Sequence, residues 1–255
     1  KGEAEIYEGL YEEAKETYSR LIEMEPNNGS LFLKRATVYQ ALLDYDNSLA
    51  DYDKAISLES NYDSNFGKYF MLKEQGKEEE ASDLLEQLAD IKISTPMDQF
   101  MNAKVFYYME EYDKAIAGFE KSIQEGILEG NYYIGMIKEE EEVYESAISY
   151  YIEYISTSSY NNNLALVYNQ LGYSYLQILE YEKALECFNT GLNLKDSLVE
   201  SKLMRNKIIA LEFLGEYTQA NDLLETYIKS YPEDKEGIRE LDFVNTRLLE
   251  ISSLE

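Results

Sequence analysis

Residues 164–196 read LALVYNQLGYSYLQILEYEKALECFNTGLNLKD and predict two helices joined by a tight corner at residues 179–181. Small and aromatic side chains recur at helical spacing on both helices: Tyr168, Leu171, Gly172, Tyr175, Tyr181, Ala184, Phe188 and Gly191. Gly172 and Ala184 let the two backbones approach, and the aromatic rings fill the space beside them. A single pair of helices has nothing to cover its second face, so this unit needs neighbouring copies.

The same pattern returns along the chain at intervals of 32 to 37 residues. A tyrosine opens the second helix of six copies: Tyr11, Tyr45, Tyr112, Tyr144, Tyr181 and Tyr217. A small residue follows three positions later: Ala14, Ser48, Ala115, Ala147, Ala184 and Ala220. A bulky residue follows four positions after that: Tyr18, Tyr52, Phe119, Tyr151, Phe188 and Leu224. A seventh copy carries Glu78, Ala81 and Leu85 in these places, so the sequence indicates an array of repeats.

The pattern resembles that of the tetratricopeptide repeat family, whose helix–turn–helix unit has about 34 residues. The resemblance also rests on small residues at the predicted helix crossing and on prolines after two second helices: Gly2, Ala36, Ala103, Gly135, Gly172, Pro26 and Pro232. Residues 61–93 depart from the pattern, because Tyr69 takes the small-residue place and Glu78 replaces the tyrosine. The resemblance implies an all-α, right-handed superhelical solenoid of about seven helix pairs with a C-terminal capping helix.

We expect one solenoid domain over residues 1–255. Its predicted parts are a partial first repeat at 1–28, repeats at 29–60, 61–94, 95–129, 130–160, 161–198 and 199–232, and a capping helix at 233–255. Thr95 and Pro96 predict a helix start with an oxygen cap. Most other repeats lack a proline, so Asn, Ser and Asp are expected to set their corners. The polar segment 156–163 predicts the longest loop, either a hinge or a plain linker.

The composition limits the classes of partner. The 255 residues include 50 Asp and Glu against 23 Lys and Arg, which gives a net charge of −27. An acidic surface repels nucleic acid, so we expect no nucleic-acid partner. No apolar run reaches the roughly 18 residues of a membrane helix, so we expect no direct membrane span. The location stays open: the chain is either cytoplasmic, or exported or anchored through a region preceding Lys1.

The chain contains no His, and its single Cys, Cys187, falls between core positions of a predicted helix. Without His, no Ser-His or Cys-His nucleophile can be assembled, and no Gly-rich phosphate loop is present. The acidic runs at 77–80 and 139–142 lack the alternating ligands of a calcium loop. Cys187 is expected to be a buried, inert thiol. We therefore predict a non-enzymatic protein with no catalytic residue, no metal site and no cofactor.

A second stripe of residues, at i, i+4 and i+7 on the first helices, is the candidate binding surface. The family resemblance implies that first helices line a concave face that receives an extended peptide or a partner helix. The residues predicted to form this peptide-binding groove are Phe66, Phe70, Phe100, Lys104, Tyr107, Tyr108, Tyr132, Met136, Tyr173 and Arg205. Aromatic side chains are typical interface anchors. The alternative interpretation is that the stripe packs between neighbouring repeats.

The predicted function is a non-enzymatic protein–protein interaction scaffold that binds a peptide or protein segment along the concave face. Acidic residues border the stripe, so the expected partner combines apolar and basic residues. Two alternatives remain open. One is an assembly subunit that self-associates, or joins a larger complex such as an envelope complex, through its ends or convex face. The other is an adaptor or regulatory region of a longer protein.

Overall fold

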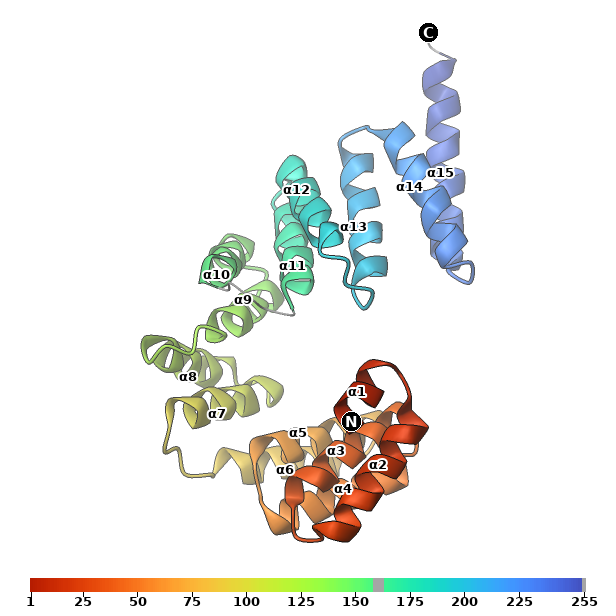
Figure 1. Cartoon of the computed structure of the whole chain (residues 1–255). Helices are drawn as coiled ribbons and strands as arrows, with labels where there is room; N and C mark the ends of the chain where they lie inside the picture. The colour runs from red at the N-terminus through yellow and green to blue at the C-terminus, as the bar shows by residue number, and fades with distance from the viewer. Residues whose placement is uncertain (158–162, 254–255) are drawn as a thin grey trace. The chain divides into compact units, whose positions relative to one another are not determined.

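The computed structural model describes residues 1–157 and 163–253, and this part of the chain is helical with no strand (Figure 1). Its helices are α1 (Gly2–Tyr7), α2 (Tyr11–Met24), α3 (Gly29–Ala41), α4 (Tyr45–Leu58), α5 (Tyr62–Glu74), α6 (Glu78–Ala89), α7 (Pro96–Tyr108), α8 (Tyr112–Gln124), α9 (Gly130–Glu140), α10 (Tyr144–Thr157), α11 (Leu164–Gln177), α12 (Tyr181–Asn193), α13 (Glu200–Phe213), α14 (Tyr217–Ser230) and α15 (Lys235–Ser252). Consecutive helices pack in pairs, and α15 follows the last pair. The predicted all-α solenoid class is confirmed.

The chain divides into two compact units, Lys1–Gly118 and Phe119–Glu255. The first unit holds α1 to α7 and the start of α8, and the second holds the rest of α8 and α9 to α15. A single solenoid domain over the whole chain stays a prediction. Most of the segment predicted as a hinge or linker, residues 158–162, lies outside the described residues.

The second helices begin where the sequence pattern predicts. Their first residues are Tyr11, Tyr45, Glu78, Tyr112, Tyr144, Tyr181 and Tyr217. The residues three positions further on have at most 1% of their surface exposed: Ala14, Ser48, Ala81, Ala115, Ala147, Ala184 and Ala220. A buried small residue at this place lets the two helices of a pair approach closely. The register of the repeats is thus confirmed, including that of the third repeat.

Two glycines show how close this approach is. A Cβ atom on Gly172 of α11 would lie 2.4 Å from the ring of Phe188 on α12. A Cβ atom on Gly135 of α9 would lie 2.6 Å from the ring of Tyr151 on α10. Both distances are shorter than the van der Waals contact distance between two carbon atoms, so a Cβ atom would clash with the ring. Glycine at these two crossings is therefore required by the large ring that faces it.

The corner inside each helix pair has a left-handed residue two positions before the second helix begins. The φ angles of these residues lie between +60° and +76°. The residues are Gly9, Leu43, Gly76, Glu110, Glu142, Leu179 and Gly215. At the corner after α11, the Leu179 N–H donates to the Leu176 carbonyl and the Glu180 N–H donates to the Tyr175 carbonyl, both at 3.0 Å. These two bonds are the usual way to end a helix on a left-handed residue.

Polar side chains set the corners before several first helices. The Thr95 hydroxyl accepts from the Asp98 N–H at 3.0 Å, and the Asp98 carboxylate accepts from the Thr95 N–H at 3.0 Å, so the predicted cap is confirmed. Asn61 likewise accepts from the Ser64 N–H. Before α13 the corner is set by Asp196, whose carboxylate accepts from the Leu198 N–H at 3.0 Å and whose carbonyl accepts from the Glu200 N–H at 3.0 Å.

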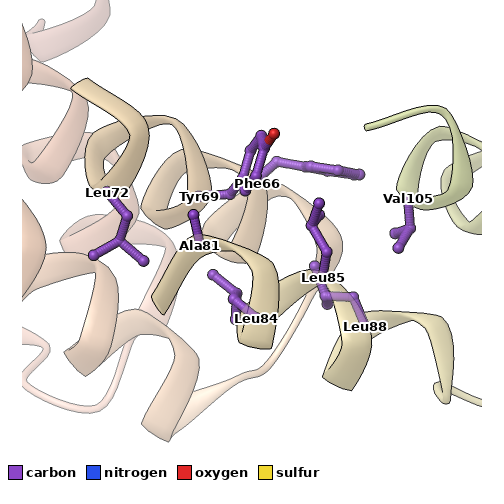
Figure 2. Close-up of a cluster of buried hydrophobic side chains, with 8 residues drawn as sticks. All are labelled: Phe66, Tyr69, Leu72, Ala81, Leu84, Leu85, Leu88 and Val105. Atoms are coloured by element: carbon purple, nitrogen blue, oxygen red, sulfur yellow. The ribbon is translucent and has the colours of Figure 1, made fainter. Parts of the chain in front are cut away.

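The third pair, α5 and α6, has an unusual crossing. Tyr69 stands where five of the other six repeats have Gly or Ala, and its ring is buried against α6. Figure 2 shows the buried cluster to which Tyr69 belongs: Phe66, Tyr69, Leu72, Ala81, Leu84, Leu85, Leu88 and Val105. Tyr69 therefore places a large ring where Gly172 leaves space for the ring of Phe188, and α6 still begins at the expected register.

The last helix closes the array. Val244 of α15 is fully buried against a cluster that includes Leu224 and Tyr227 of α14. Cys187 is buried as predicted, and burial raises the pKa of its thiol to about 12, which keeps it protonated and unreactive at neutral pH. Within residues 1–157 and 163–253, no helix has the length and apolar character needed to cross a membrane.

Candidate binding surfaces

The predicted site residues of the first unit form a cluster of touching aromatic rings on α5 and α7. Ring centroids lie 5.5 Å apart between Phe66 and Tyr108, 5.3 Å between Phe70 and Tyr108, and 5.2 Å between Tyr69 and Phe70. Tyr107 stacks edge to face on Tyr108 at 5.2 Å. Phe66 and Phe70 stack because they lie one helical turn apart, and both stacked and edge-to-face contacts between rings are favourable. We call these five residues the aromatic cluster.

The aromatic cluster and its neighbour Phe100 combine core and surface residues. Phe66 and Phe100 are only 5% and 7% exposed, so both serve the hydrophobic core. Phe70 is 39% exposed although its ring contacts three other rings. A ring held by its neighbours loses little conformational freedom when a partner binds it. Phe70 is thus the residue of this group that presents a fixed apolar surface to solvent.

Lys104 of α7 lies over two of these rings. Its Nζ is 5.0 Å from the ring centroid of Phe66 and 5.9 Å from that of Phe100. Burial lowers the pKa of Lys104, while the nearby Asp63 carboxylate opposes this shift. The aromatic faces offset part of the cost of holding a cation there. Lys104 therefore brings a partly desolvated positive charge into an acidic protein.

The predicted site residues of the second unit have different environments. Tyr132 and Met136 of α9 pack against the core between α9, α10 and α11. The Tyr132 ring lies 5.8 Å from that of Tyr154. Tyr173 of α11 is 37% exposed. Of these three side chains, Tyr173 offers the most surface to a partner.

Arg205 of α13 is held by α15. Its guanidinium donates to the Asp234 carboxylate at 2.8 Å and to the Glu236 carboxylate at 3.0 Å. Asp234 also caps α15 by accepting from the N–H groups of Glu236 and Gly237. This network ties the last repeat to the closing helix. Arg205 therefore has a structural role that sequence spacing alone did not reveal.

A polar contact joins the fifth and sixth repeats beside the predicted stripe. The Glu139 carboxylate of α9 accepts from Tyr151 at 3.1 Å, from Gln170 at 2.9 Å and from Ser174 at 3.2 Å. Burial raises the pKa of Glu139, and the hydrogen bonds from Tyr151 and Ser174 oppose that shift. One repeat further along, the Asn206 amide donates to the Asn169 amide oxygen at 2.9 Å. First helices of successive repeats are thus joined by polar as well as apolar contacts.

The sequence also matches known repeats. Residues 1–28, 30–62 and 162–197 match a tetratricopeptide repeat family, and residues 208–234 match a second tetratricopeptide repeat description. These segments are tetratricopeptide repeats. Proteins of this family are generally non-enzymatic scaffolds for protein–protein interaction. The matched ranges fall on the first, second, sixth and seventh repeats, and the third, fourth and fifth repeats lie between them.

A curated relative carries the same repeat. Over 83 residues the chain is 31% identical to small glutamine-rich tetratricopeptide repeat-containing protein 2 of Saccharomyces cerevisiae. The match covers 32% of this chain and 24% of that protein, so the chain spans about a quarter of the relative's length. The relative thus supports the tetratricopeptide family and leaves the partner of this chain unassigned.

Solved tetratricopeptide structures share the fold. The APC/C hetero-tetramer Cut9–Hcn1 has a TM-score of 0.69 at 13% identity, over 89% of this chain and 45% of that chain. A tetratricopeptide repeat protein from Parabacteroides merdae has a TM-score of 0.64 at 15% identity, over 96% of each chain. A human IFIT1 dimer with PPP-AAAA has a TM-score of 0.60 at 19% identity, over 93% of this chain and 64% of that chain. At these identities the similarity concerns the fold alone.

The ten predicted residues thus fall into two groups on the tetratricopeptide first helices. Six lie on α5 and α7 in the first unit: Phe66, Phe70, Phe100, Lys104, Tyr107 and Tyr108. Four lie on α9, α11 and α13 in the second unit: Tyr132, Met136, Tyr173 and Arg205. Ring contacts join Phe66, Phe70, Tyr107 and Tyr108 of the first group, and Lys104 lies over the rings of Phe66 and Phe100. Their role as a peptide-binding groove stays a prediction.

Proposed function

We propose that this chain binds a segment of another protein on the first-helix faces of its repeats, with half-exposed aromatic side chains as anchors. The observation that carries the proposal is Phe70, which is well exposed yet held between the rings of Phe66, Tyr69 and Tyr108. Aromatic anchors with few rotatable bonds dominate the binding energy of many protein interfaces. Tyr173 of α11 is the corresponding anchor of the second unit.

The net charge of −27 favours a partner segment with basic residues next to its apolar anchors. Attraction between opposite charges raises the association rate and weakens as salt screens it. Binding is therefore expected to weaken with increasing salt. The PPP-AAAA ligand of the human IFIT1 structure is expected not to bind this chain, because its phosphates would meet an acidic surface.

A displayed random-peptide library tests this proposal. The library is panned against the native chain, and the enriched peptides are then titrated against Phe70→Ala, Tyr173→Ala and the control Tyr7→Ala. Tyr7, at the end of α1, is 94% exposed and lies off the predicted stripe. Circular dichroism first establishes that all four proteins are equally helical. We expect at least one anchor variant to lose about tenfold in affinity, a loss of ~1.4 kcal/mol, while Tyr7→Ala binds as the native chain does.

Two results would overturn the proposal. The first is a set of enriched peptides that bind Phe70→Ala and Tyr173→Ala as tightly as the native chain. The second is enrichment of acidic peptides whose binding does not depend on salt. Absence of any enriched peptide would also count against it and would favour an assembly subunit, whose concentration-dependent mass light scattering would measure.

A further inference from the structure

A cavity of about 220 Å³ lies beside the third repeat, between α5, α6 and the end of α7. Its apolar wall includes Tyr69, Ala81 and Tyr108, and its polar residues include Lys73 and Glu78. Figure 2 shows Tyr69 and Ala81 on the two helices that form one side of it. All the lining residues belong to the first unit. The cavity is distinct from the exposed face of Phe70, which is not among its lining residues.

The repeat register explains why the space is there. Glu78 occupies the position at which the other six repeats carry a half-buried tyrosine. In the sixth repeat that tyrosine, Tyr181, stacks on Phe213 with centroids 4.8 Å apart and ring planes within 2°. Phe213 precedes Tyr217 by four residues, as Tyr108 precedes Tyr112, so Tyr108 is its counterpart. The cavity therefore borders the ring against which a second-helix tyrosine stacks in the sixth repeat.

We propose that this cavity is a docking site for a tyrosine side chain of a partner protein, which fills the third repeat as the chain's own tyrosine fills the others. The size is sufficient, because a protein cavity of about 150 Å³ already admits a benzene ring. The walls are suitable, since Tyr69 and Tyr108 provide aromatic surfaces for edge or stacked contacts. Polar groups on the other side offer hydrogen-bond partners to a phenol hydroxyl.

The charges around the cavity specify the residues that flank the docked ring. Glu78, Glu79 and Glu80 form the acidic first turn of α6, and Glu110 also lines the cavity. Lys73 forms an ion pair with Glu78, so the charged lining residues are one lysine and two glutamates. Opposite charges across an interface favour the matching partner and disfavour like-charged ones. The expected ligand is therefore a tyrosine with basic neighbours.

The test uses two capped tripeptides, Lys-Tyr-Lys and the matched Lys-Ala-Lys, titrated into the full chain by NMR. The blocking variant is Glu78→Tyr, which restores the chain's own pattern and fills the cavity. Its control is Glu79→Tyr, which adds the same ring and removes the same charge at the next, exposed position of α6. A second blocking variant, Ser82→Phe, narrows the cavity from the exposed side of α6.

We expect Lys-Tyr-Lys to bind the native chain and Glu79→Tyr at least tenfold more tightly than Lys-Ala-Lys does. Glu78→Tyr and Ser82→Phe are expected to lose that preference, and Glu78→Tyr to melt at a higher temperature than the native chain because its ring fills the cavity. Tyr173→Ala, which changes the proposed anchor of the second unit, should keep the preference, and this separates the cavity from the surface of the proposed function.

Equal binding of the two tripeptides to the native chain, or an unchanged preference in both blocking variants, would overturn the proposal. Self-association of the native chain that Glu78→Tyr abolishes and Glu79→Tyr retains would name a second copy as the occupant, and would equally overturn the assignment to a distinct partner.

Discussion

The sixth repeat (α11 and α12) and the third repeat (α5 and α6) differ in which helix supplies the large ring at the helix crossing. In the sixth, Gly172 lies under the ring of Phe188 and leaves no room for a Cβ atom. In the third, Tyr69 itself is the large residue, and Ala81 and Leu85 of α6 face it (Figure 2). Both pairs keep the same register, so the register does not depend on which helix supplies the ring. What changes is the free space, because only the third repeat lacks a tyrosine at the start of its second helix.

The largest expected effect comes from giving the third repeat the small residue that the pattern calls for. Tyr69→Ala removes a buried ring from the cluster between α5 and α6 and enlarges an existing cavity. Removal of a large buried side chain costs the lost transfer energy plus the cavity, so we expect a destabilisation of ~3 kcal/mol in urea unfolding. Tyr7→Ala, at an exposed position, is the control. A loss below ~1 kcal/mol would mean that Tyr69 does not support the crossing.

The reverse change in the sixth repeat is expected to be smaller. Gly172→Leu forces a side chain into the Phe188 ring, and overpacking of this kind costs ~1–3 kcal/mol. Gln177→Leu, at an exposed position of the same helix, is the control and should change the free energy of unfolding by less than ~0.5 kcal/mol. If both variants proved equally stable, α11 and α12 would not approach as closely as the glycine requires.

The smallest effect concerns Glu139, a carboxylate of the fifth repeat that the sixth repeat helps to bury. Glu139 lies under Gln170 and Ser174, whereas the Lys73–Glu78 ion pair of the third repeat is solvent-exposed. Burial raises the pKa of Glu139 above its ordinary value of 4.5, so the folded protein holds this proton more tightly than the unfolded chain does. Stability from this group is present at low pH and is lost as pH rises through the folded pKa.

Glu139→Gln removes this titration, so unfolding measured from pH 4 to pH 8 should show a weaker fall in stability for the variant. We expect the difference at neutral pH to be below ~1 kcal/mol, because solvent screens a partly buried group. Glu145→Gln, at an exposed position of α10 that is not among the charges acting on Glu139, should keep the native pH profile. The sign would be contradicted by a variant that loses stability more steeply with rising pH than the native chain.

The sequence was sufficient for the helix pairs because each repeat supports the same register independently. Local spacing could predict Thr95 and Asp98, which lie three residues apart. It could not predict the partner of Arg205, since Asp234 lies 29 residues further along and meets Arg205 only when α15 packs. A missing tyrosine at position 78 is visible in the sequence, but the cavity beside it also depends on how Tyr69 and Tyr108 pack around it, which local spacing does not give.

The aromatic stripe was harder to interpret for a geometric reason. It follows the boundary between the packed and the exposed sides of the first helices, so one helical turn decides the environment of each member. Phe66 lies on the buried side of this boundary, while Phe70, four residues later, lies on the exposed side. Hydrophobic periodicity assigns both to the same stripe and cannot separate an interface anchor from a core residue.

The left-handed corners have a consequence for how the protein tolerates change. Leu43, Glu110, Glu142 and Leu179 adopt a backbone conformation that costs a side-chain-bearing residue on the order of 1 kcal/mol, while three other corners use glycine. Leu43 and Leu179 are exposed, so their side chains contribute little packing in return. Glycine at these positions, which occur in both units, would remove this backbone strain and so stabilise the folded protein. A lineage that acquired glycine there could then accept destabilising substitutions at a binding face without losing the fold.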